Sequence, residues 1–190
     1  MNAAEYLALE TLRDGRPVRI RALKPADRAL MLAAVDRIGD ASLYRRFFSP
    51  KHHFTDTEID YYINVDFVSH VALVAELEEN GEPVIAGGGR YIVSAPGCAE
   101  MAFAVDDPHH GLGIGTLLMR HLALIAKAAR LHTLKAEVLA DNAPMLAVFR
   151  RSGLPITLAR DGGVTLVHMD CRHESETQGE DDRPSPPGVH

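Results

Sequence analysis

Three glycines at alternate positions, Gly111, Gly113 and Gly115, are the residues whose spacing most clearly predicts chemistry. Glycine has no side chain, so neighbouring backbone N–H groups can converge on an anion. Residues 100–105 before them alternate small and bulky side chains, as in a half-buried strand, and residues 118–129 repeat apolar side chains at helical spacing. A strand, a glycine-rich turn and a helix N-terminus in this order predict a phosphate-binding loop.

Three known phosphate-binding patterns compete for this loop, and a glycine-rich turn without a ligand is the alternative. A dinucleotide-binding turn requires Gly-x-Gly-x-x-Gly and an acidic residue about 20 positions later, which fits poorly here. A P-loop requires Gly-Lys followed by Ser or Thr, and the sequence contains none. The third pattern is the pyrophosphate loop of the GNAT acyltransferases, Gln/Arg-x-x-Gly-x-Gly/Ala. Residues 110–115 resemble it, with His110 at the position of Gln or Arg.

Composition indicates one globular domain. The chain has 190 residues, of which 46% are hydrophobic and 24% are charged. Its net charge of −6 argues against a nucleic-acid partner. Two cysteines, Cys98 and Cys171, are expected to be reduced thiols. Because we find neither a signal-peptide pattern nor an apolar stretch of about 18 residues, we expect a cytoplasmic protein without a membrane partner.

The rest of the sequence predicts the elements that position the loop. A hairpin is expected around Asp14-Gly15, and three helices should begin near Lys24, Asp40 and Thr55. A helix following Asn142 is predicted near the C-terminal end. Outside the hairpin, the predicted strands cover residues 71–75, 84–93, 100–105, 133–139, 156–159 and 164–169.

The sequence also predicts the boundaries of the domain and marks one irregular strand. Residues 1–16 form an N-terminal extension with a hairpin strand, and residues 17–171 form the domain. Residues 172–190 are nearly devoid of apolar side chains and predict a disordered acidic, proline-rich tail. The glycine triplet 87–89, inside a predicted strand, either weakens that strand or marks a close approach of backbone.

This order of elements is similar to that of the GNAT fold, and the resemblance covers roughly residues 18–170. It implies an α/β (α+β) fold in which a mixed, mostly antiparallel twisted sheet of about six or seven strands is flanked by helices. Residues 12–21 and 42–48 further resemble the acetyltransferase domain of bacterial protein-lysine acetyltransferases of the Pat type. In that family the domain is often fused to a ligase-like or nucleotide-sensing domain.

The resemblance implies an acetyl-CoA-dependent N-acetyltransferase. Its acceptor would be a primary amine, with a protein lysine side chain favoured, that attacks the acetyl group directly. Glu100 stands where many lysine-acetylating members carry a glutamate, so it is the expected general base for an ammonium whose free pKa is about 10.4. Strand alternation places Glu100 on the same face as Ala102 and Ala104, whose small side chains leave room for a substrate.

The resemblance also implies how acetyl-CoA binds. Loop amides would hold its pyrophosphate, and the backbone of residues 103–105 would pair with its pantetheine arm. Asn142 either contacts the pantetheine or only caps a helix, and both roles stay open. The residues expected to bind the co-substrate are Phe103, Ala104, Val105, His110, Gly111, Leu112, Gly113, Ile114, Gly115, Thr116, Asn142, Met145 and Phe149.

Two departures from the family pattern keep alternatives open. Phe149 stands where many members carry a tyrosine that protonates the departing sulfur, and a phenyl ring has no proton to give. Together with His110, this keeps a non-catalytic acyl-CoA-binding sensor open as an alternative. A small-molecule amine is the alternative acceptor for the enzyme. The pairs His52-His53 and His109-His110 lack the i, i+4 spacing of metal-binding helices, so no metal is expected. A monomer and a homodimer are both compatible with the sequence.

Overall fold

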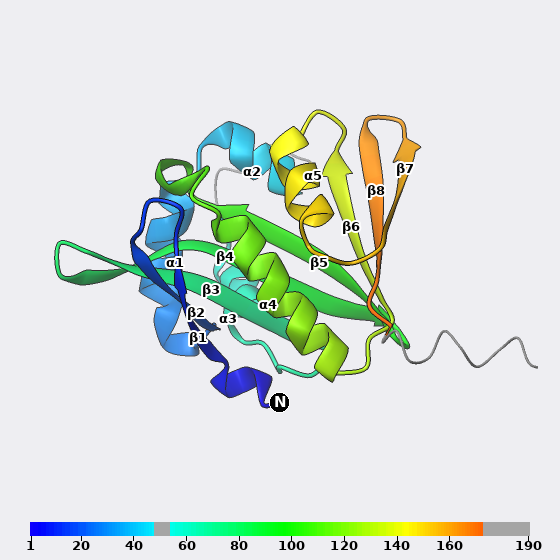
Figure 1. Cartoon of the computed structure of the whole chain (residues 1–190). Helices are drawn as coiled ribbons and strands as arrows, with labels where there is room; N and C mark the ends of the chain where they lie inside the picture. The colour runs from blue at the N-terminus through cyan, green and yellow to red at the C-terminus, as the bar shows by residue number, and fades with distance from the viewer. Residues whose placement is uncertain (48–53, 173–190) are drawn as a thin grey trace, which may run out of the picture.

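A computed structural model describes residues 1–47 and 54–172 and shows one eight-stranded sheet with helices on both faces (Figure 1). The strands are β1 Leu7–Thr11, β2 Pro17–Ala22, β3 His70–Glu79, β4 Glu82–Ala95, β5 Cys98–Val105, β6 Thr133–Leu139, β7 Ile156–Asp161 and β8 Val164–Asp170. Their order across the sheet is β1-β2-β3-β4-β5-β6-β8-β7. All neighbours are antiparallel except β5 and β6, which are parallel.

The predicted mixed, mostly antiparallel sheet is therefore confirmed, but the predicted number of strands was slightly too low. The sheet has eight strands instead of six or seven, because both strands of the N-terminal hairpin join it. The helices are η1 Ala3–Glu5, η2 Pro25–Asp27, α1 Arg28–Asp36, α2 Asp40–Phe47, α3 Asp56–Ile63, η3 Asp107–His109, α4 Ile114–Ala128 and α5 Ala143–Arg150. Phe48, His52, His53 and the predicted tail after Arg172 lie outside the described residues.

Local sequence signals account for where the helices begin. Thr55 and Glu58 form a capping box at the start of α3, in which each side chain accepts from the other's backbone N–H. Asn142 caps α5, because its side chain accepts from the N–H of Met145 at 3.2 Å. In contrast, Gly113 precedes α4 with a left-handed backbone, and no side chain caps that helix.

The two faces of the sheet are covered by different helices (Figure 1). Helix α4 crosses one face and buries Leu118, Met119 and Leu122 completely, in the larger apolar core. Helices α1 and α3 lie behind the sheet in this view. A smaller apolar cluster on that second face contains Leu23, Ala34, Ala72, Val74 and Ile85. The α4 face and the α1/α3 face, as we call them below, therefore differ in the amount of apolar packing.

Charged side chains occupy part of the α1/α3 face. The guanidinium of Arg21 donates to Asp27 Oδ2 at 2.7 Å and to Glu76 at 2.5 Å, and both carboxylates are buried. Buried charges are tolerated when they are paired in this way.

Cys98 and Cys171 are free cysteines. Among the described residues, no helix is long and apolar enough to cross a membrane.

Candidate active site

Strands β5 and β6 are paired at one end only. Their parallel ladder joins residues 98–100 to residues 133–135. β5 continues to Val105 and β6 to Leu139, but these continuations, which the structure fully describes, do not pair with each other. The backbone groups on this edge of β5 are therefore available to an extended ligand that would pair with them as a strand does.

A cleft of about 1020 Å³ occupies this opening and extends to the start of α4 and to α5. Glu100 lines the cleft, as does every residue predicted to bind the co-substrate except Leu112. Leu112 instead contributes its carbonyl, which accepts from the backbone N–H of Arg13 at 3.1 Å. Residues far apart in the sequence are thus collected around one opening in the sheet.

Backbone conformation explains two of the three loop glycines, and packing bears on the third. Gly111 and Gly113 adopt φ values of +79° and +95°, a left-handed conformation that other residues rarely take. At Gly115 packing is tight, because a Cβ there would lie 3.3 Å from a methyl group of Val148 on α5. In the first hydrogen bond of the helix, the Leu117 N–H donates to the carbonyl of Gly113. The N–H groups of the residues before Leu117 therefore remain available to a ligand. Uncapped amides at a helix N-terminus suit a phosphate.

His110 is solvent-exposed at the edge of the cleft, and its ring is turned toward the backbone. Its Nε2 donates to the carbonyl of Val105 at 2.9 Å, which ties the end of β5 to the loop. Asp107 Oδ1 lies 3.6 Å from the same nitrogen. The ring nitrogen that reaches Val105 is therefore engaged with the protein itself.

His109, next to it, is buried in an ionic network behind the loop. Its Nδ1 lies 2.5 Å from Asp106 Oδ1, and its Nε2 lies 2.9 Å from Glu79 Oε1. Each ring nitrogen of His109 therefore faces a carboxylate, and the ring links Glu79 on β3 to Asp106 at the end of β5. The hydrogen bond from His109 holds the pKa of Glu79 below its ordinary value, and Arg16 adds to this effect. Arg37 donates to Asp106 Oδ2 at 2.7 Å, which completes the network.

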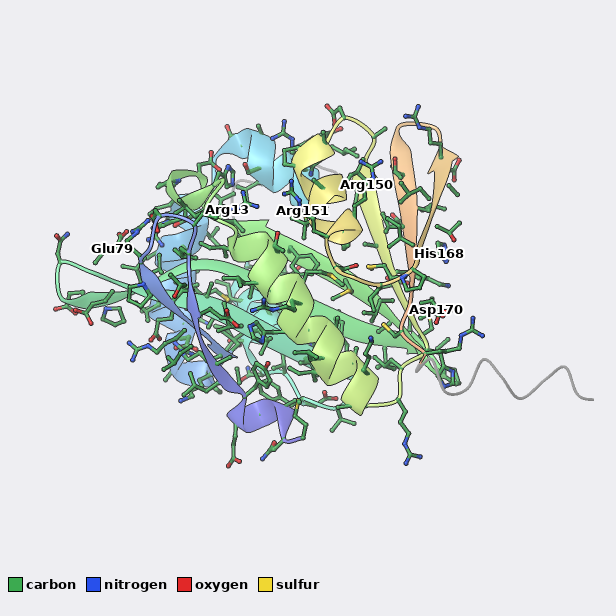
Figure 2. The ribbon with its side chains drawn as sticks, viewed as in Figure 1. Arg13, Glu79, Arg150, Arg151, His168 and Asp170 are labelled. Carbon is green, nitrogen blue, oxygen red and sulfur yellow. The ribbon has the colours of Figure 1, made fainter. Side chains whose placement is uncertain are left out.

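Arg13, from the turn between β1 and β2, is a lining residue that the sequence analysis did not identify. Its Nη1 donates to the carbonyl of Gly111 at 3.1 Å, while its backbone N–H donates to Leu112. No carboxylate among the described residues pairs with it, whereas Arg16, Arg19 and Arg21 of the same hairpin are all ion-paired. In Figure 2, Arg13 and Arg151 lie on either side of the N-terminal end of α4. A free cation therefore stands beside the uncapped amides.

Glu100 is the last β5 residue that pairs with β6, directly before the strands separate. Its register partners are Ile92 on β4 and Lys135 on β6, and His168 follows across the sheet on β8. Glu100 is exposed, and no salt bridge to it occurs within 4.0 Å among the described residues. Glu100, Lys135 and His168 all line the cleft. The carboxylate is therefore open to a substrate rather than neutralised by its neighbour.

Phe149 lines the far side of the cleft and is almost completely buried. Its ring packs edge-on against Phe103, with 5.8 Å between ring centroids. It forms part of the apolar wall and has no hydroxyl group to offer. Asn142 caps α5 through its Oδ1, as described above, and also lines the cleft, so its amide N–H groups are free to meet a ligand.

The end of the cleft nearest α3 is aromatic and cationic. Arg90 lies over the ring of Tyr62, 4.6 Å from Cζ to the ring centroid, and donates to His70 Nε2 at 2.9 Å. Burial lowers the pKa of His70 to about 4, and the charge of Arg90 adds to this shift.

Among the described residues, no group of three or more His, Cys, Asp or Glu side chains is arranged to hold a metal ion.

Comparison with known proteins identifies the class of this fold and cleft. The profile of the Acetyltransferase (GNAT) family matches residues 41–154, which is more than half of the chain. The chain belongs to this family, a class of acyltransferases whose co-substrate is acetyl-CoA. The predicted fold and enzyme class are thereby confirmed.

Among its relatives is acetyltransferase Pat of Mycolicibacterium smegmatis, 31% identical over 161 residues, or 84% of this chain and 47% of that protein. Acetyltransferase PA5475 of Pseudomonas aeruginosa is 32% identical over 120 residues, or 63% of this chain and 64% of that protein. This chain therefore spans less than two thirds of either relative. The solved GNAT domain of S. lividans PAT is 29% identical, with a TM-score of 0.77 over 86% of this chain and 96% of that one. The predicted resemblance to the Pat type is confirmed.

The structure of the acetyltransferase yncA of Salmonella typhimurium, determined with its cofactor acetyl-CoA, has a TM-score of 0.62. It covers 80% of this chain and 92% of that one, but its 22% identity establishes a common fold only.

Proposed function

We propose that this protein transfers the acetyl group of acetyl-CoA to a protein lysine side chain, with Glu100 as the general base. The observation that carries this proposal is the position of Glu100. Its exposed carboxylate lines the cleft at the point where β5 and β6 separate. The bacterial relatives favour a bacterial cytoplasmic setting, and residues 17–171 are the proposed catalytic domain.

The proposed binding mode uses groups that the fold leaves unpaired. Amides of Ile114, Gly115 and Thr116 at the uncapped start of α4 would hold the pyrophosphate, with Arg13 adding a positive charge beside them. The backbone edge of residues 103–105 would pair with the pantetheine arm. The thioester would then lie close to Glu100, and the side chains of Met145 and Phe149 would pack against the arm.

The proposed reaction removes two protons from the lysine nitrogen and exchanges a C–S bond for a C–N bond. Glu100 takes a proton from the lysine ammonium, directly or through one water, so that the neutral amine attacks the acetyl carbonyl carbon. The C–N bond forms, the C–S bond breaks, and CoA leaves as a thiolate. The acylated nitrogen gives up its second proton, which passes through water to that thiolate, so that the products are the amide and the CoA thiol. Phe149 takes no part in that last step. Tyr61, which is exposed at the end of the cleft, suits a cationic amine approaching over its ring.

The test compares Glu100→Gln with Glu137→Gln, because both glutamates are exposed and line the same cleft. With a panel of lysine-bearing proteins and small amines, we expect Glu100→Gln to lower kcat for thiol release by about 10²–10⁴-fold. Its Kd for acetyl-CoA, measured by calorimetry, should stay within about twofold, because neither charge nor hydrogen bonding at the loop changes. Glu137→Gln should retain activity.

Three other outcomes have distinct meanings. Full activity of Glu100→Gln would remove Glu100 from the mechanism. Release only with small amines would replace the lysine acceptor by a small-molecule acceptor. Tight binding of acetyl-CoA without release to any acceptor would favour the sensor module, which the missing hydroxyl group at Phe149 supports.

A further inference from the structure

The glycine triplet of β4 contains one glycine that close packing does not explain. A Cβ at Gly87 would lie 2.9 Å from the carbonyl oxygen of Ala104, and one at Gly89 would lie 2.7 Å from the ring of Phe103. Both positions therefore require glycine. At Gly88 the nearest heavy atom would be the carbonyl oxygen of Leu73 at 3.5 Å, which is an ordinary contact. An alanine fits at Gly88 without displacing a neighbour.

Gly88 borders a second cavity, of about 110 Å³, between the sheet and helices α1 and α3. Protein interiors contain few voids larger than a water molecule. A pocket with mainly apolar walls suits an apolar ligand. Its apolar walls include Leu32, Val35, Ile59, Val74 and Ile85. The missing side chain at Gly88 therefore helps to keep an apolar space open on the α1/α3 face.

This cavity shares part of its lining with the acetyl-CoA cleft. Ala102 and Ala104 line both spaces, as do Tyr62 and Arg90. In the β4–β5 ladder, Gly88 is paired with Ala104 and Arg90 with Ala102. A path with very small side chains therefore leads from β5, where the thioester would lie, across to Gly88.

We propose that the 110 Å³ cavity, called the acyl pocket below, receives the alkyl tail of acyl-CoA thioesters longer than acetyl-CoA. This inference rests on the proposed function, because it places the thioester beside Ala102 and Ala104. An apolar cavity of about 150 Å³ holds the six carbons of benzene, so the acyl pocket scales to about four carbons. The preferred donors are therefore short straight-chain acyl thioesters, such as butyryl-CoA.

The residues that line the two spaces indicate that the acyl pocket takes the tail of the acyl-CoA donor and not the amine acceptor. Glu100, Lys135 and His168 line the cleft but not the acyl pocket. An amine that gives its proton to Glu100 must approach on that side of Ala102. The acyl pocket lies on the opposite side, toward β4 and β3, where the tail of the thioester extends.

The test is calorimetric titration of the full chain with acetyl-, butyryl- and decanoyl-CoA, without an acceptor. Burial of each added methylene should raise the affinity up to about fourfold, so butyryl-CoA should bind about tenfold more tightly than acetyl-CoA. Decanoyl-CoA exceeds the capacity of the pocket and should lose this gain. In Gly88→Ala the preference for butyryl-CoA should fall to about threefold or less, while the Kd for acetyl-CoA stays within twofold.

Two further variants keep the comparison interpretable. Gly163→Ala makes the same change in a turn where a Cβ would meet nothing within 4 Å, and it should keep the wild-type preference. Ala102→Val fills the shared path from the β5 side and should also remove the preference, which provides a second test if Gly88→Ala unfolds. Thermal unfolding of each variant checks the fold.

Equal or weaker binding of butyryl-CoA by the wild type would overturn the inference, and the proposed function would stand. A Gly88→Ala effect on the KM of the acceptor alone, with unchanged donor affinities, would assign the acyl pocket to the acceptor and also overturn it. Failure of every CoA thioester to bind the wild type would instead overturn the proposed function.

Discussion

The α4 face and the α1/α3 face of the sheet bury side chains in different ways. On the α4 face, completely buried residues such as Leu118 and Leu122 belong to one large apolar core. On the α1/α3 face, a small apolar cluster is accompanied by buried ion pairs and by a cavity of about 110 Å³. The tightly packed face fixes the helix whose N-terminus we propose binds phosphate. The loosely packed face contains the cavity that we propose takes the acyl tail.

The largest expected effect comes from emptying the tightly packed face. Leu122→Ala should lower the free energy of unfolding by about 3–4 kcal/mol, because Leu122 is completely buried and the cavity left behind cannot collapse. Leu30→Ala, at a partly buried position against the smaller cluster, should cost about 1 kcal/mol. Urea denaturation of both variants measures the difference. Equal costs would show that the two faces are packed to the same degree.

A pH effect of up to about 3 kcal/mol should come from the other face, through His70. Its pKa is about 4 in the folded protein, against an ordinary value of 6.5. As the pH falls from 6.5 to 4, the unfolded chain binds a proton at this ring that the folded protein does not bind. Stability should therefore be complete above about pH 6.5 and should decrease steadily through this window.

His70→Gln tests this explanation, since glutamine can still accept from Arg90 but does not titrate. Urea unfolding at pH 7, 5.5 and 4.5 should show a clearly flatter dependence for the variant than for the wild type. His168→Gln is the matched control, because it makes the same change at a solvent-exposed histidine. Identical slopes for His70→Gln and the wild type would assign the acid sensitivity to other groups.

The same contrast explains which parts of the site could be predicted from the sequence. The glycine-rich turn and its helix were predicted because glycine spacing and helical periodicity are local signals, whereas phosphate binding by the turn stays a prediction. The triplet 87–89 was recognised as unusual, but its three glycines look alike in the sequence. Only the opposing atoms of Ala104, Phe103 and Leu73 separate the two required glycines from Gly88. Contacts across the sheet decide their roles, and no local pattern contains them.

Arg13 illustrates the same limit at the site itself. It lies 98 positions before Gly111, whose carbonyl it contacts, and it belongs to a segment read from the sequence as an extension. The sequence analysis named His110, at the family's Gln or Arg position, as a residue that binds the co-substrate. In the structure its ring donates to the carbonyl of Val105. In this structure the cation beside the loop amides comes from the β1–β2 turn, which sequence proximity does not reveal.

The smallest expected effect tests this cation. Arg13→Gln should weaken acetyl-CoA binding about tenfold, or about 1.4 kcal/mol, because the charged hydrogen bond that we propose for Arg13 and the phosphate would be lost while the α4 amides remain. The loss should shrink as salt is added, since the contact is exposed and screened. Arg160→Gln, on exposed β7 and outside the cleft, removes the same charge and should have no such effect. Calorimetry at low and high salt measures both variants. An unchanged affinity for Arg13→Gln would mean that the phosphate does not depend on Arg13, and the helix terminus and Arg151 on the other side of it would then be left to hold the phosphate.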